Sequence, residues 1–268
     1  MDKPLFSYKF VNSKLEIKPK TVKKRLYNTD KLLHGSLAFI ALFFVQVLVG
    51  KSGWIVADLF SYDLFDPDHL FALLSVHHIA QMLIALAVIA VLSQLIKVDF
   101  GFRLGDSRNG LRYFLIFTGI IAAIALIYHI LLYYFDQALT FDFPLTKKNV
   151  LGTLGFQLFL SGTSEEILYR ALPVTVFVYV FGQSIRIKWD FTLEVVLASC
   201  LFTAAHIKWS LFPFSVDLNL SQLFYAFAMG IVNGIVYQQT RSILYPMLMH
   251  SISNVLMVGT GYLFVFLL

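Results

Sequence analysis

Residues 161 to 173 read Ser-Gly-Thr-Ser-Glu-Glu-Ile-Leu-Tyr-Arg-Ala-Leu-Pro and place Glu165, Glu166 and Arg170 inside a long apolar sequence. A charge near the centre of a bilayer costs about 2.5 to 3.5 kcal/mol, so such residues face a protein interior or a water-filled cavity and often carry function. Glu166 and Arg170 are four residues apart and share one helix face, whereas Glu165 is turned by about 100° from its neighbour. We therefore predict that one acid pairs with Arg170 while the other stays available.

The composition around this stretch is that of a membrane protein. Of the 268 residues, 58% are hydrophobic and only 14% are charged. This predicts an all-α polytopic membrane protein, with about eight transmembrane helices around an intramembrane active-site cavity. The net charge of +5 does not indicate nucleic acid, because nine Lys or Arg fall within the first 31 residues and indicate a cytoplasmic flank. Cys200 is the only cysteine, which excludes an intrachain disulfide and a cysteine zinc cluster.

The apolar runs predict where the helices lie. We expect a basic cytoplasmic arm over 1–31, N-terminal transmembrane helices within 32–148 and a catalytic core over 149–268. Pro173 is expected to end or kink the fourth helix, and the short run that follows it counts as a separate helix. The expected helices cover residues 32–50, 70–96, 111–135, 149 onward, 174–185, 191–207, 220–238 and 243–268.

The charges between the helices predict the orientation in the cell membrane. The loop over 51–68 holds four aspartates and one lysine, as expected outside, so the amino terminus is expected in the cytoplasm. The acids of the fourth helix follow its apolar half, so we expect the site to open toward the cytoplasm. Arg186 and Lys188 would then lie outside if the short fifth helix spans, against the positive-inside trend.

Two later pairs of residues are spaced to meet the acids in a common interior. Phe202 and His206 lie four apart, as do His250 and Asn254, so each pair shares one helix face. Together with Glu165 they supply a base, two imidazoles and an amide.

The order Glu-Glu-x-x-x-Arg, Phe-x-x-x-His and His-x-x-x-Asn closely resembles the CPBP family of intramembrane proteases. This family includes the type II CAAX prenyl endopeptidases and bacteriocin-processing enzymes. Residues 230–250, Gly-Ile-Val-Asn-Gly-Ile-Val-Tyr-Gln-Gln-Thr-Arg-Ser-Ile-Leu-Tyr-Pro-Met-Leu-Met-His, resemble the family's glycine-spaced helix, polar turn, proline and histidine. The resemblance covers about residues 150–258.

The resemblance implies an endopeptidase that cleaves a peptide bond at or within the membrane. Glu165 would activate a water as general base, because a carboxylate screened from bulk water suits that role. Glu166 with Arg170 would orient Glu165, and Phe202 would shape the cavity. His206 would position the water, and His250 and Asn254 would stabilise the oxyanion.

A metal is the open question for this mechanism. The family has been classified as metalloprotease, and Glu165, His206 and His250 could bind zinc with one open position. However, the sequence has no His-Glu-x-x-His motif. We therefore prefer a glutamate mechanism without a metal cofactor and keep zinc as the alternative.

Other readings of the polar residues remain. His77, His78, His129 and Asn233 are interpreted as structural, and His34 and His69 as interfacial. Two other classes of protein compete with the protease: a non-catalytic immunity or scaffold protein and a proton-coupled transporter. Prenylated C-termini, signal-peptide remnants and bacteriocin or pheromone precursors would all suit as the substrate, in contact with membrane lipid.

Overall fold

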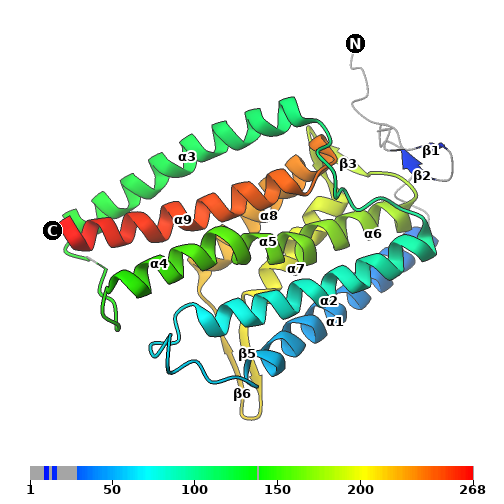
Figure 1. Ribbon diagram of the computed structural model, residues 1–268. Helices are drawn as coiled ribbons and strands as arrows, with labels where there is room; N and C mark the ends of the chain where they lie inside the picture. The colour runs from blue at the N-terminus through cyan, green and yellow to red at the C-terminus, as the bar shows by residue number, and fades with distance from the viewer. Residues whose placement is uncertain (1–8, 12–13, 17–28, 138, 268) are drawn as a thin grey trace.

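The computed structural model describes residues 9–11, 14–16, 29–137 and 139–267, so most of the predicted basic arm lies outside the described residues. The chain is a bundle of helices that run roughly side by side (Figure 1), which confirms the all-α membrane architecture. The helices are α1 (Thr29–Ala57), α2 (Ala72–Ile96), α3 (Ser107–Tyr134), α4 (Lys147–Phe156), α5 (Gly162–Glu166), α6 (Leu172–Phe181), α7 (Leu193–Ala205), α8 (Leu220–Thr240) and α9 (Leu244–Leu267), and two π-helical turns are η1 (Gln157–Ser161) and η2 (Ile167–Ala171).

Among the described residues, the strands form three short antiparallel pairs. They pair β1 (Lys9–Val11) with β2 (Lys14–Glu16), β3 (Arg186–Lys188) with β4 (Phe191–Thr192), and β5 (Lys208–Leu211) with β6 (Phe214–Asp217). The β5–β6 hairpin directly follows His206 and lies beside the end of α1 (Figure 1). It therefore contributes to the surroundings of the candidate site.

The segment from α4 to α6 is one continuous helix, where the sequence predicted two. The residues at its internal junctions, Gln157, Gly162, Ile167 and Leu172, all have right-handed helical backbone angles. The amide of Leu172 donates to the carbonyl of Ile167, five residues back. Pro173 therefore follows a π turn whose hydrogen-bond register has already changed, and the helix continues through it. The described chain has seven helical segments, and the expected count of eight is not confirmed.

Five of these helices, α1, α2, α3, α8 and α9, are long and apolar enough to cross a membrane. Large apolar side chains cover their outer surfaces, for example Leu48 in α1, Leu83 in α2 and Ile120 in α3, each more than half exposed. Such a surface is expected of helices that face lipid.

The continuous helix ends on the same face of the bundle as the start of α1. The ammonium of Lys31 donates to the carbonyl of Phe181 at 2.7 Å. The β3 residues Arg186 and Lys188 follow Phe181 after a four-residue loop, so they lie on the side where α1 begins. The sequence predicts that these two residues break the positive-inside trend if a separate fifth helix crosses the membrane. Because the fifth helix is part of the continuous helix, that exception does not arise.

The loops at each end of the bundle are joined by hydrogen bonds, and each end forms one face of the molecule. The basic face holds the start of α1 and the loops over 97–106, 182–192 and 241–243; the amide of Asp106 donates to the carbonyl of Thr240 at 2.8 Å there. The acidic face holds the loops over 58–71, 135–146 and 206–219. On that face Asn149 donates to Asp68 at 2.8 Å.

The continuous helix passes through the middle of the bundle, between α1 and α2 on one side and α9 on the other (Figure 1). The short helix α7 completes this core by packing on α8. Gly230 and Gly234 allow this approach, since a Cβ at either position would come within 2.8 Å of α7 atoms. The buried carboxylate of Glu194 accepts hydrogen bonds from Ser184 and from Gln238, which anchors the start of α7.

Candidate active site

A fully buried ion pair lies at the centre of the site. Glu166 and Arg170 are both 0% exposed, and Oε2 of Glu166 lies 3.4 Å from Nε of Arg170. Oε1 of Glu166 accepts hydrogen bonds from Nδ2 of Asn233 at 3.0 Å and from Nδ1 of His250 at 2.8 Å. Because the carboxylate can only accept, Nδ1 of His250 carries a proton. Three helical segments are thus joined through one carboxylate.

Glu165 is turned away from this network and retains access to solvent. Its side chain is 19% exposed, in contrast to its neighbour Glu166. Oε2 of Glu165 lies 3.7 Å from Nε2 of His250. This distance is too long for a direct hydrogen bond, so a water that contacts both groups could connect them. As expected, one acid, Glu166, is paired with Arg170, and the other, Glu165, remains available at the cavity.

Phe202 links the ion pair to the histidines. The guanidinium carbon of Arg170 lies 4.2 Å from the centre of its ring, a cation–π contact. The rings of His206 and His250 pack against Phe202 in T-shaped arrangements, with 4.6 and 5.9 Å between the ring centroids. Phe202 therefore packs between charged and imidazole groups, behind the cavity wall formed by its neighbour Leu201.

His206 is the C-cap residue of α7 and lines the cavity. Its Nδ1 lies 2.9 Å from the carbonyl oxygen of Phe202, which can only accept. This contact places the proton of a neutral His206 on Nδ1 and leaves a lone pair on Nε2. The lone pair is suited to accept a proton from a water in the cavity that His206 lines.

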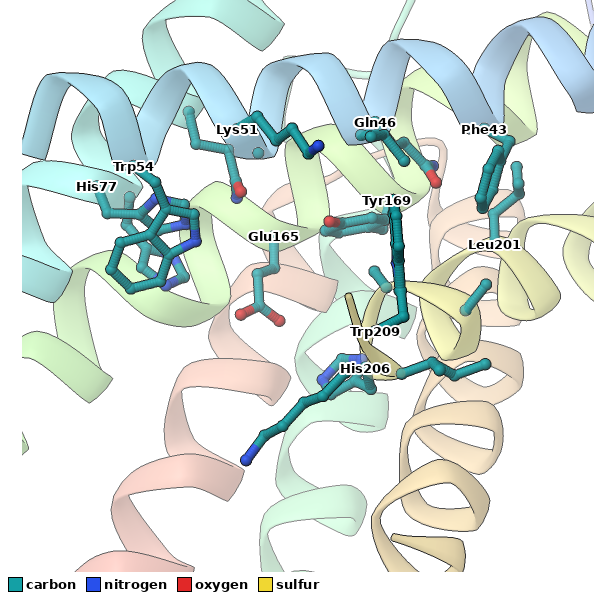
Figure 2. Close-up of a pocket in the computed structure, with 18 of the residues that line it drawn as sticks. Phe43, Gln46, Lys51, Trp54, His77, Glu165, Tyr169, Leu201, His206 and Trp209 are labelled. Atoms are coloured by element: carbon teal, nitrogen blue, oxygen red, sulfur yellow. The ribbon is translucent and has the colours of Figure 1, made fainter. Parts of the chain in front are cut away.

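Glu165 and His206 line a cavity of about 690 Å³ between the second half of α1, the start of α2 and the end of α7. Figure 2 shows the carboxylate of Glu165 pointing into this space, with Trp54 and His77 on one side and Tyr169 and His206 on the other. A volume of this size is typical of sites for small molecules or for a short peptide segment.

Asn254 lies one helical turn beyond His250 and contacts the helix that carries the acids. Its Nδ2 donates to Oγ of Ser161 at 3.1 Å. The approach of α9 depends on Gly162, where a Cβ would come within 2.6 Å of the backbone nitrogen of Ser251. A larger residue would separate the two helices and with them Glu166 and His250.

Two π-helical turns flank the acids. The turn η1 ends at Ser161 and η2 begins at Ile167, so the short α5 that holds both glutamates lies between them. Turns of this kind occur mostly as single-turn bulges inside α-helices and are frequent at functional sites.

Residues 147–256 match the family model "Type II CAAX prenyl endopeptidase Rce1-like", over less than half of the chain. This segment is a CPBP-family domain. Membership of the family implies a protease. No curated protein and no solved structure matches the chain.

The CPBP-family segment brings most of the predicted site residues together. Glu165 and His206 line the cavity, while Glu166, Arg170 and His250 form the buried network behind it. Phe202 bridges these groups, and Asn254 lies one turn farther along α9. All of them come from helices α5, η2, α7 and α9.

Two histidines from outside the CPBP-family segment also reach this site, and the sequence interpretation had assigned them to structure. His77 and His78 both line the cavity. Nδ1 of His78 lies 2.6 Å from Oγ of Ser164, next to Glu165, while His77 stacks on Trp54 with 4.2 Å between ring centroids. Their only signal in the sequence was two adjacent imidazoles in an apolar helix.

The described part of the CPBP-family segment does not hold its donors in a metal-binding arrangement. No group of three His, Cys, Asp or Glu side chains among the described residues is placed to hold a metal ion. The zinc set Glu165, His206 and His250 is therefore not brought together as ligands, and we derive no step through a metal. Nδ1 of His250 contacts Glu166 and Nδ1 of His206 contacts a backbone carbonyl, so Nε2 of each ring is the nitrogen that a metal would need.

Proposed function

We propose that this protein is an intramembrane endopeptidase in which Glu165 activates a water to hydrolyse a peptide bond of a membrane-associated or lipidated substrate. The observation that carries the proposal is the pair of adjacent glutamates in unlike surroundings. Glu166 is buried against Arg170, Asn233 and His250, while Glu165 faces a cavity that can hold a peptide segment. The CPBP-family match supports peptide-bond chemistry.

In the proposed reaction, Glu165 takes a proton from the water as the water oxygen bonds to the carbonyl carbon of the substrate. The C–N bond then breaks, and Glu165 passes the proton to the departing amine. The product acid releases its own proton, and the enzyme returns to its starting state. His206, whose Nε2 is free of protein partners on its own helix, would orient the water.

The oxyanion of the tetrahedral intermediate needs donors that are already in place. His250 in its protonated form offers Nε2–H beside Glu165, and Glu166 holds the ring by its other nitrogen. By family resemblance, Asn254 would be the second donor. Its amide would then give up the hydrogen bond to Ser161 and donate to the oxyanion instead. Glu166 and Arg170 position His250 and do not touch the substrate.

The test compares the parent protein with Glu165→Gln, which keeps the shape of the side chain and removes the base. Each protein is reconstituted with host membranes, and newly formed peptide N-termini are identified by mass spectrometry. We expect new termini with the parent and with Asp217→Asn, an exposed carboxylate-to-amide control on β6, and none with Glu165→Gln. Identical termini from parent and Glu165→Gln would remove the assigned role. Absence of cleavage by every protein would favour a non-catalytic scaffold.

A further inference from the structure

The mouth of the cavity lies at the acidic face. Its exposed lining residues Lys51 and Trp54 belong to the last two turns of α1, and Lys208 and Trp209 belong to β5. The ammonium of Lys51 lies 5.4 Å from the centre of the Trp209 ring, so the two walls meet beside the opening. Figure 2 shows Lys51 and Trp54 on α1 above the carboxylate of Glu165.

The opposite end of the cavity is closed by packing. Leu201 is 1% exposed, and Gln46 and Tyr169 are buried. Beyond them lies the large apolar core around α6, whose residues Leu172 and Phe177 are 0% exposed. Glu165 is therefore reached from the acidic face and not from the basic face. This corrects the expectation that the site opens on the side of the basic amino terminus.

The two faces differ strongly in charge. With the adjoining helix ends included, the basic face has eight Lys or Arg and four Asp among the described residues, while the acidic face has four Lys and seven Asp. A further eight Lys or Arg precede α1 in the sequence. The cations of the basic face are Lys31, Lys97, Arg103, Arg108, Arg112, Arg186, Lys188 and Arg241.

An excess of Lys and Arg beside short loops marks the cytoplasmic side of a membrane protein. We infer that the basic face is cytoplasmic and that the cavity containing Glu165 opens on the side of the membrane away from the cytoplasm. The substrate is then a peptide segment exposed on that side, such as an exported precursor or the outer segment of a membrane protein. A lipidated tail on a cytoplasmic protein lies in the other leaflet and does not reach this mouth.

The substrate part of this inference rests on the proposed function, whereas the orientation of the mouth does not. The first experiment therefore measures orientation alone. In a Cys200→Ala background, Ser210→Cys reports on the cavity wall in β5 and Ser107→Cys reports on the exposed start of α3 at the basic face. Lys208→Cys, at an exposed position of the mouth, is a second reporter if Ser210→Cys does not fold.

A membrane-impermeant maleimide is added to right-side-out cells and to inside-out vesicles. We expect the Ser210 and Lys208 variants to label at least tenfold faster in right-side-out cells, and the Ser107 variant at least tenfold faster in inside-out vesicles. Faster labelling of either mouth variant from the cytoplasmic side overturns the inference.

A second experiment maps the cleavage sites found with the parent protein and missing with Glu165→Gln. Sites in outer segments support the inference, and sites in cytoplasmic segments overturn its substrate part. The two failures remain distinguishable. If the mouth variants label from outside but no protein cleaves, the proposed function fails and the orientation stands.

Discussion

Nδ1 of His250 donates a 2.8 Å hydrogen bond to Oε1 of the fully buried Glu166. This bond fixes the ring so that Nε2 points to Oε2 of Glu165 at 3.7 Å. One glutamate therefore orients the histidine that serves the other. The adjacent acids have different tasks because the helix turns one of them to the core and the other to the cavity.

Arg170→Ala should destabilise the protein by about 3 to 5 kcal/mol, because it leaves the buried carboxylate of Glu166 without its cation. Thermal unfolding of the purified protein measures this. Arg103→Ala is the matched control, since Arg103 also pairs with an acid four residues away, Asp99 at 3.1 Å, but at an exposed site. Its cost should be about 0 to 1 kcal/mol. Equal melting of the two variants would contradict the buried pairing.

Gly162→Ala should lower both stability and cleavage, because its Cβ would meet the backbone of Ser251 at 2.6 Å and push α9 away from the acids. Gly155→Ala lies on the same continuous helix with no atom within 4 Å of its Cβ. We expect that control to stabilise the protein by about 0.5 to 1 kcal/mol and to leave cleavage unchanged. If both variants behave alike, the close approach at Gly162 does not matter to the site.

His78→Ala and Ser164→Ala should each slow cleavage by roughly fivefold, because each removes one hydrogen bond worth about 1 kcal/mol beside Glu165. The double variant should be no slower than the slower single variant, since both changes remove the same contact. His129→Ala is the control, a buried histidine of α3 that contacts the Ala125 carbonyl. Additive losses in the double variant would show that His78 and Ser164 act separately.

A chelator should leave cleavage by the active protein unchanged, and metal analysis should find much less than one equivalent of zinc. The reason is that no group of three His, Cys, Asp or Glu side chains among the described residues is placed to hold a metal ion. Stoichiometric zinc, removed by chelator with a loss of cleavage that added zinc reverses, would contradict the glutamate mechanism. The protease assignment would survive that result.

The helical membrane class and most helix positions could be predicted from the sequence, because both depend on local composition and on runs of apolar residues. The expected helix over 220–238 corresponds to α8, and that over 111–135 to α3. The prediction of a separate helix after Pro173 was wrong. Whether the helix continues there depends on a π turn and on tight packing around α6, and neither can be recognised in the pattern of apolar residues.

The motif residues of the site could also be predicted, because charged and imidazole side chains in apolar helices need partners and their spacing places them on shared faces. The sequence alone determined that Glu165, Glu166, Arg170, His206 and His250 were candidates. The folded structure added Asn233 and His78 to the site and showed that the cavity mouth lies at the acidic face. The physical reason is that these features arise from contacts between helices distant in the chain, whose relative positions no local pattern specifies.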